Sequence, residues 1–177
     1  TDADWAEVVL GSFHTCATKT NGQLWCWGKN GYRQLGDGTL NNKSSPARVG
    51  TDADWTMPVV GSNHTCATKT NGRVWCWGNN DYGQLGDGRL SRRSTPMRVE
   101  TAEDWAKPAS HYHTCVTKVN GQLWCWGNNV FGQLGDGTTV SRAIPARVGA
   151  DSDWAALVAT NHTCGIKVNG QLWCWGW

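Results

Sequence analysis

The residues best equipped for chemistry lie in one segment, HTCATKTNGQLWCWG, which runs from His14 to Gly28. A histidine precedes Thr-Cys, a second cysteine follows ten residues after the first, and a tryptophan flanks that second cysteine on each side. Thiolates and an imidazole could bind zinc, two thiols could form a redox pair, and cysteines beside a histidine could attach haem. The alternative is a structural cross-link.

The cysteine spacing argues against a cofactor. A zinc site needs two cysteines two to four residues apart or a second Cys/His pair, and covalent haem needs C-x-x-C-H. Neither pattern is present, and a catalytic thiol would stand alone, whereas this segment occurs four times. We therefore expect no metal, no cofactor and no catalytic cysteine.

A hairpin explains the spacing. Cys16 and Cys26 lie directly opposite each other if the loop is the three residues 20–22, Thr-Asn-Gly, whose final glycine suits a left-handed conformation. Counting back from the closing pair Lys19 and Gln23 makes the cysteines a non-hydrogen-bonded pair, with Cα atoms about 4.5 Å apart, close enough for a disulfide. The same counting predicts four disulfides: Cys16–Cys26, Cys66–Cys76, Cys115–Cys125 and Cys164–Cys174. Four such pairs indicate an oxidising, extracellular location.

The whole chain of 177 residues repeats one unit. Each copy reads D-W, then H-T-C, an N-G turn and L/V-W-C-W-G; a second block, N-x-x-G-Q-L-G-D-G followed by P-x-R-V, occurs three times with small variations. The tryptophan of D-W recurs after 50, 50 and 49 residues, at Trp5, Trp55, Trp105 and Trp154. We expect one repeat domain, 1–177, with units of approximately 1–28, 29–78, 79–127 and 128–177.

This period is typical of propellers and related arrays. Apolar residues alternate or form short runs bounded by Gly, Asn and Asp, which indicates strands rather than helices. The prediction is an all-β, propeller-like array of four blades with about four antiparallel strands each and one disulfide per blade. Because P-x-R-V occurs three times, the first blade is expected to be incomplete. Pro58 and Pro108 make the strand after D-W an edge or irregular strand.

The tryptophans around the second cysteine point to the face opposite the cysteine. They could form platforms for sugars or bases, but recurrence in every unit favours packing between blades. They are Trp25, Trp27, Trp75, Trp77, Trp124, Trp126, Trp173 and Trp175.

The recurring histidines could be ligands, bases or switches. A histidine at the same strand position in each unit favours a structural hydrogen bond that ties a loop, and His111, which breaks the pattern, is expected to be a surface variant. The recurring set is His14, His64, His113 and His162.

Acidic pairs precede each D-W, as in Asp2/Asp4, Asp52/Asp54 and Asp151/Asp153, with Glu103/Asp104 in the third unit. Calcium takes six to eight oxygen ligands, so turn formation is the simpler interpretation, and weak calcium binding stays open. No Ser-His-Asp set or carboxylate pair stands apart from the repeat, and G-Q-L-G-D-G lacks the Lys-Ser/Thr of a phosphate loop. We therefore expect that this protein is not an enzyme.

Charge and hydropathy exclude other classes. The formal net charge is +2 and Lys and Arg are scattered, which predicts no nucleic-acid partner. No apolar run is long enough to cross a bilayer, so no membrane insertion is expected, and no signal-like leader opens the sequence.

The combination of H-T-C-A, G-Q-L-W-C-W-G, G-Q-L-G-D-G and P-x-R-V resembles the repeat of the regulator of chromosome condensation family over essentially the whole chain. The resemblance implies four-stranded propeller blades, which family members usually close into a ring of seven. Family functions include nucleotide exchange on a small GTPase, chromatin contact and, in bacteria, secreted binders such as a β-lactamase inhibitor. The cysteine pairs resemble the secreted bacterial style, and no wedge or basic tail for nucleotide exchange is present.

Four units leave the outward faces of the first and last copies without a neighbour. Because the units are nearly identical, these two faces should fit each other, which predicts head-to-tail self-association into a ring or an extracellular filament, with Trp177 at the junction. The alternative is a secreted module that binds a protein or a glycan through its loops, which depart from the repeat at 29–32, 80–82 and 129–131.

Overall fold

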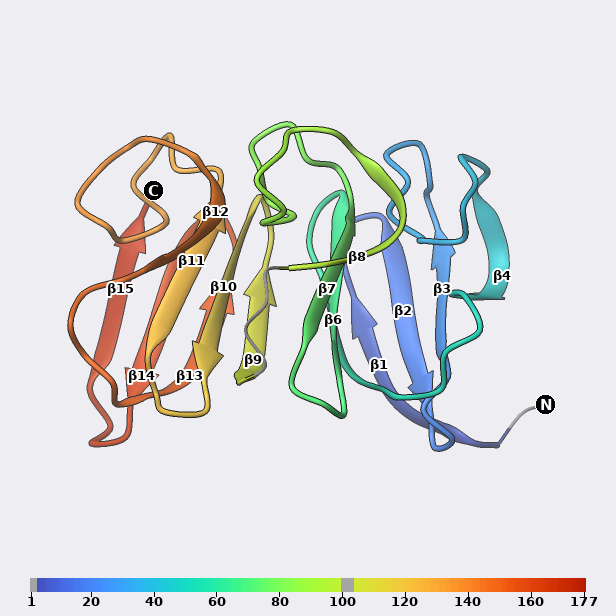
Figure 1. Cartoon of the computed structure of the whole chain (residues 1–177), viewed down its shortest axis with the longest axis horizontal. Coiled ribbons are helices and arrows are strands. Elements are labelled where there is room, and N and C mark those ends of the chain that lie inside the picture. Colours follow the sequence, from blue (N-terminus) through green and yellow to red (C-terminus); the bar gives the residue numbers. More distant parts are fainter. Residues whose placement is uncertain (1–2, 100–103) are drawn as a thin grey trace.

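The computed structural model describes residues 3–99 and 104–177. In this part of the chain 15 strands form four separate sheets that stand side by side (Figure 1). The described residues contain no helix of the length and apolarity needed to cross a membrane.

Each sheet is one blade. Blade 1 consists of β1 (Trp5–Leu10), β2 (His14–Lys19), β3 (Leu24–Gly28) and β4 (Lys43–Arg48). Blade 2 consists of β5 (Trp55–Val60), β6 (His64–Lys69), β7 (Val74–Gly78) and β8 (Arg93–Arg98). Blade 3 consists of β9 (Trp105–Ser110), β10 (His113–Lys118), β11 (Leu123–Gly127) and β12 (Arg142–Arg147). Blade 4 consists of β13 (Trp154–Ala159), β14 (His162–Lys167) and β15 (Leu172–Gly176).

The predicted hairpin and its cross-link are confirmed. In blade 1 the backbone N–H of Lys19 donates to the carbonyl of Gln23, and Gly22 has a φ of 79°. Cys16 therefore lies opposite Cys26, with Cα atoms 4.1 Å apart and a disulfide between them. All four predicted pairs are bonded in this way, so each blade carries one disulfide.

The expectation that the first blade is incomplete is wrong. The P-x-R-V strand pairs with the second strand of the hairpin that precedes it, as shown by Cys26 opposite Ala47. It does not pair with the hairpin that follows. Blade 1 therefore has four strands, whereas blade 4 has three among the described residues. The cause is the loop between the third and fourth strands, which we call the strap and which returns the chain to the edge it has just left.

An asparagine organises each strap. The side-chain N–H groups of Asn30 donate to Asp37 and to the carbonyl of Thr39, while its side-chain oxygen accepts from the backbone N–H of Leu35. Asn80 and Asn129 make the same contacts in blades 2 and 3. The N-x-x-G-Q-L-G-D-G block is thus a folded loop whose buried polar groups satisfy one another.

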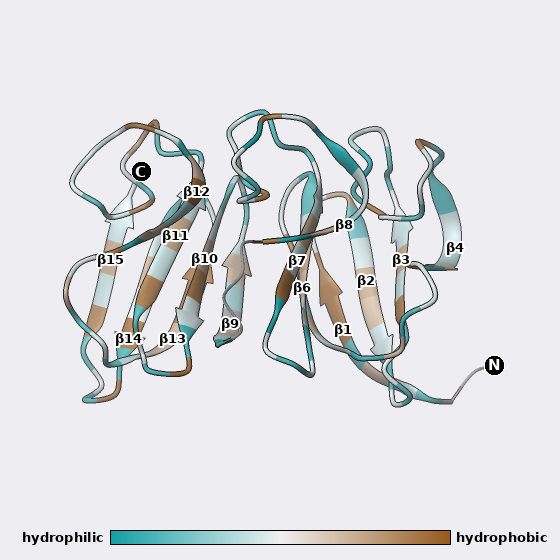
Figure 2. Cartoon of the chain, viewed as in Figure 1, coloured by the Kyte–Doolittle hydropathy of each residue, from teal (hydrophilic) through white to brown (hydrophobic). Residues whose placement is uncertain are grey.

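The first strand of each blade lies at the inner edge. Strand β5 contacts both β1 and β9, and β9 contacts β13, so these strands lie next to one another from blade to blade. Each is an edge strand of its own sheet with a bulge after its tryptophan, which is compatible with Pro58 and Pro108. Outer strand β4 and the strap between β7 and β8 are largely hydrophilic, whereas hydrophobic bands cross β1 and β10 (Figure 2).

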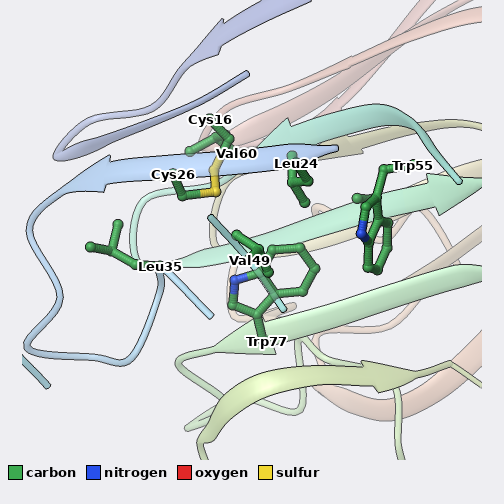
Figure 3. Close-up of a cluster of buried hydrophobic side chains, with 9 residues drawn as sticks. Cys16, Leu24, Cys26, Leu35, Val49, Trp55, Val60 and Trp77 are labelled. Carbon is green, nitrogen blue, oxygen red and sulfur yellow. A yellow bond between two sulfur atoms is a disulfide. The ribbon is translucent and has the colours of Figure 1, made fainter. Parts of the chain in front are cut away.

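The hydrophobic core lies between blades rather than within one blade. A cluster at each of the three blade junctions combines residues from two sheets, and Figure 3 shows the one between blades 1 and 2. Blade 1 contributes Cys16, Leu24, Cys26, Leu35 and Val49; blade 2 contributes Trp55, Val60, Ala67 and Trp77.

Candidate functional site

The two sides of every blade differ in composition. We call the side that bears the disulfide the cysteine face, and the opposite side, which bears the tryptophans, the tryptophan face. At each junction the cysteine face of one blade packs on the tryptophan face of the next, as Figure 3 shows with Val49 of blade 1 beside Trp77 of blade 2. The order is the same at all three junctions, so the array has a direction.

A hydrogen-bond relay joins the faces. The hydroxyl of Thr65 in blade 2 donates to the carbonyl of Gln34 in the strap of blade 1, and the indole N–H of Trp77 donates to the same carbonyl. Because the Thr65 proton is used in this way, its oxygen accepts from Nε2 of His14, at 2.7 Å. The recurring histidine therefore ties two blades together.

The relay recurs at the other two junctions. His64 pairs with Thr114, and the Gln84 carbonyl accepts from Thr114 and Trp126. His113 pairs with Thr163, and the Gln133 carbonyl accepts from Thr163 and Trp175. His111, expected at the surface, is half-buried, with Nε2 2.8 Å from the Ser62 hydroxyl of the neighbouring blade.

Burial keeps the relay histidines neutral. It lowers the pKa of His14 to about 4 and those of His64 and His113 to about 3, because a charged imidazole would lose its hydration inside the junction. His162, at the end of the array, is exposed instead.

The tryptophan face of blade 1 has no neighbouring blade among residues 3–99 and 104–177. Trp5 is 38% exposed, whereas its counterpart Trp55 is 4% exposed, and Leu10 is 77% exposed where Val60 is 8% exposed. These side chains match those that form a junction in blade 2, but they are exposed to solvent.

The cysteine face of blade 4 is likewise uncovered in the described part of the chain. Leu172 is 66% exposed, whereas Leu24 and Leu123 at the same position are fully buried. A shallow hollow of about 70 Å³ with almost entirely apolar walls lies on this face, lined by Ala156, Leu157, Val158, Cys164, Ile166 and Leu172. The two ends of the array thus present the complementary halves of a junction.

The tryptophans around the second cysteine differ in how deeply they are buried. Trp77 and Trp126 are fully buried at junctions, Trp27 and Trp175 are half-buried, and Trp173 is exposed. The first tryptophan of the motif is half-buried in the other three blades, at Trp25, Trp75 and Trp124. Each of these three meets the D-W tryptophan of its own blade edge-on.

The acidic pairs hold lysines over these rings. Asp52 and Asp54 both contact the ammonium of Lys69, at 2.5 and 3.0 Å, and that ammonium lies 4.6 Å from the centre of the Trp55 ring. Asp151 and Asp153 hold Lys167 in the same way, while Asp4 and Asp104 each contact one lysine. Asp2 and Glu103 lie outside the described residues.

Metal binding has no support in the described ranges, in which no group of three His, Cys, Asp or Glu residues could hold an ion. The acidic pairs contribute instead to ion pairs and to cation–π contacts, a role that sequence reasoning missed. The signal was available, because the lysine of H-T-C-x-x-K recurs in every unit.

A second exposed surface lies on the strap-bearing end of the blades. The rings of Phe131 and Trp177 stack with centres 5.3 Å apart, and Trp177 is 73% exposed. A pocket of about 370 Å³ beside them is lined by Tyr82, Tyr112, Asn128, Phe131, Gln133, Asn161 and Trp177. Trp177, the residue expected at the head-to-tail junction, thus lies beside this pocket of the loop surface.

Comparison with known families places the repeat. Residues 21–68 and 120–165, more than half of the chain, match the regulator of chromosome condensation (RCC1) repeat. A second pattern of the same description matches residues 5–34 and 59–84.

Solved structures share the fold. The chain superposes on human WBSCR16 with a TM-score of 0.86 at 21% identity, covering 99% of this chain and 48% of that protein. It superposes on yeast RCC1 (Prp20), solved with Kap60, with a TM-score of 0.87 at 18% identity, covering 99% of this chain and 44% of the other. The 177 residues thus span about half the length of the propellers that they match.

Proposed function

This chain belongs to the regulator of chromosome condensation (RCC1) repeat family of β-propellers, and on that premise we propose that it is a secreted structural protein whose copies associate head to tail. The tryptophan face of blade 1 in one copy packs on the cysteine face of blade 4 in the next. The observation that carries this proposal is the exposure at the two ends of side chains that every internal junction buries.

The internal junctions supply the template for the contact. Where Trp77 packs against the Cys16–Cys26 hairpin, Trp27 of a second copy would pack against the Cys164–Cys174 hairpin. His162, exposed on blade 4, would meet Thr15 as His14 meets Thr65. A contact between two different faces is heterologous, so it gives a ring if the rotation closes and a filament if it does not.

Four disulfides in a chain of this size support an oxidising location. Each disulfide closes a short hairpin. In blades 1 to 3 the bonded cysteines are buried in a junction. Cross-linked hairpins would resist local opening, which suits an extracellular structural protein.

Sedimentation velocity combined with electron microscopy tests the self-association. We expect species larger than the monomer to grow with protein concentration, and Leu10→Asp to abolish them, because an unpaired carboxylate cannot be buried in an apolar contact. Val119→Asp is the matched control, since Val119 is a similarly exposed residue in a hairpin turn away from both faces. A protein that stays monomeric at high concentration would contradict the proposal.

A second candidate function rests on the aromatic pocket of the loop surface. Exposed aromatic rings beside amide side chains are typical of binding sites for proteins and glycans. The yeast relative Prp20p is described with its binding to Gsp1p and histones. By analogy, we propose that this end of the blades can hold an extracellular protein or glycan.

Variants of the pocket test this second function. Tyr82→Ser and Phe131→Ser remove exposed rings, so both should weaken retention of a ligand identified by a glycan array or by capture from native medium. Val119→Ser, at the opposite end of a blade, is the control. Equal binding by all three variants would assign the ligand to another surface.

A further inference from the structure

Blade 2 departs from its neighbours at one strap position. Thr39 in blade 1 and Thr138 in blade 3 occupy a place that is Arg89 in blade 2. The fourth strand changes too, because Met97 stands where blades 1 and 3 have alanine. A residue that leaves a repeat pattern is not required by the architecture that the repeat builds.

The threonine has a structural task that the arginine side chain does not take over. The hydroxyl of Thr39 donates to Asp37 at 2.8 Å, and that of Thr138 donates to Asp136 at 2.7 Å. In blade 2, Asp87 keeps two bonds from the guanidinium of Arg93, at 3.0 and 2.7 Å, as Asp136 keeps one from Arg142 in blade 3. The strap is therefore held without the Arg89 side chain, which is exposed.

Arg89 lies on a cleft of about 370 Å³ at the outer edge of the array. The cleft lies between the strap and β8 of blade 2 and β12 of blade 3, which meet where the N–H of Gly88 donates to the carbonyl of Ala143 at 2.9 Å. Its lining residues are Gly86, Asp87, Gly88, Arg89, Arg93, Met97, Arg98 and Ile144.

The cleft combines positive charge with apolar walls. Arg89, Arg93 and Arg98 line the cleft, and its carboxylate, Asp87, is nearly buried and paired with Arg93, which leaves the exposed guanidinium of Arg89 at the cleft. Met97 and Ile144 are both exposed, and they supply apolar surface beside the charge.

The same place between blades 1 and 2 keeps two cations, Lys43 and Arg48, but lacks the third cation and the apolar side chains. There the N–H of Gly38 donates to the carbonyl of Ser94, which is the equivalent strap contact. The residues that correspond to Arg89, Met97 and Ile144 are Thr39, Ala47 and Thr95. The molecule thus contains its own control cleft.

We propose that the cleft of blade 2 binds a small organic phosphate or sulfate ester. The tetrahedral oxoanion lies against the guanidinium group of Arg89, because arginine presents parallel N–H donors that match two oxygens of such a group. The carbon framework of the ester lies on Met97 and Ile144. This site is separate from the two end faces and does not depend on self-association.

Calorimetric titration of the intact chain with inorganic phosphate, phenyl phosphate and phenyl sulfate tests the site. We expect one site per chain, with phenyl phosphate binding more tightly than inorganic phosphate because its ring reaches the apolar wall. The phenyl sulfate titration shows which of the two oxoanions the site prefers. Absence of saturable binding by both phenyl esters would overturn the proposal.

Two arginine variants locate the site. Arg89→Thr restores the residue of the neighbouring blades and should weaken phenyl phosphate binding about tenfold or more, the usual effect of losing a charge-assisted hydrogen bond. Arg92→Asn removes the same charge from the same strap, but outside the cleft, since Arg92 pairs with Asp81 and covers the Tyr32 ring. An equal loss in both variants would show that only net charge matters.

A transplant gives a positive test that does not rely on loss. The combined variant Thr39→Arg, Ala47→Met and Thr95→Ile carries the blade 2 residues into the control cleft. We expect the number of phenyl phosphate sites per chain to rise from one to two, with an unchanged circular dichroism spectrum. A folded transplant that still binds one ligand would contradict the assigned roles of these side chains.

Discussion

Trp55 and Trp5 occupy the same position in successive blades, yet one is 4% exposed and the other 38%. The sequences around them are the same for five residues, TDADW. The difference is the neighbour, because Trp55 has the cysteine face of blade 1 against it and Trp5 has no blade against it in the described residues. The comparison shows that each face of a blade forms one side of a junction, and that its side chains are buried only when a neighbouring blade covers them.

Replacing the second tryptophan of W-C-W should give the largest difference in stability between a covered and an uncovered tryptophan face. Trp77→Ala leaves a cavity and removes one of the two donors to the Gln34 carbonyl, so we expect a loss of about 3–5 kcal/mol in the free energy of unfolding. Trp27→Ala, on the uncovered face, should cost about 1–2 kcal/mol. Urea denaturation at low protein concentration measures both, and equal losses would show that junction packing is not the main source of stability.

Acid should weaken the junctions between blades. The pKa of His64 is lowered to about 3, so the unfolded chain binds protons between pH 6.5 and 4 that the folded chain does not. Stability is therefore complete above about pH 6.5 and falls as the pH is lowered, by up to about 1.4 kcal/mol per pH unit for each buried histidine. His64→Gln should flatten the dependence of the thermal midpoint on pH. The same slope in the variant and in the unaltered protein would contradict the relay.

The disulfides should differ in accessibility. Cys66 and Cys76 are buried in a junction, whereas Cys174 is exposed on the uncovered face of blade 4. Under a mild reductant followed by alkylation, mass spectrometry should find Cys164 and Cys174 labelled at least about tenfold faster, since exchange requires access to a sulfur atom. Labelling at equal rates would mean that the junctions open as readily as the free end.

Replacing the threonine of the relay should give the smallest difference in stability between a junction and the uncovered face. Thr65→Val leaves the Gln34 carbonyl with one donor fewer and His14 without its acceptor, which should cost about 1–2 kcal/mol. Thr15→Val changes the same position on the uncovered face and should be nearly neutral. Thermal denaturation compares the two, and a neutral Thr65→Val would remove the relay from the list of stabilising contacts.

Much of this architecture could be predicted from the sequence because the chain repeats itself. The three-residue loop sets the hairpin register, and that register brings Cys16 opposite Cys26, so the disulfides followed from counting. The propeller-like array of strands followed from the period of the repeat. Both inferences use contacts between residues that are close in sequence.

Contacts between distant residues could not be predicted in the same way. The strand Lys43–Arg48 pairs backwards because Asn30 folds the strap, and nothing in the local pattern distinguishes this from pairing forwards. The relay depends on a backbone carbonyl, which carries no sequence signal. The cleft joins Arg89 of the blade 2 strap to Ile144 of blade 3, which lies 55 residues further along the sequence.

Mixing two variants tests the head-to-tail contact most directly. Leu10→Asp disables the tryptophan face of blade 1, and Leu172→Asp disables the cysteine face of blade 4, so each variant alone should be monomeric. In a 1:1 mixture each chain keeps the one face that the other needs. Sedimentation velocity should then show dimers and nothing larger, because every dimer is capped at both ends. A mixture that stays monomeric, or a single variant that still forms large species, would contradict the account.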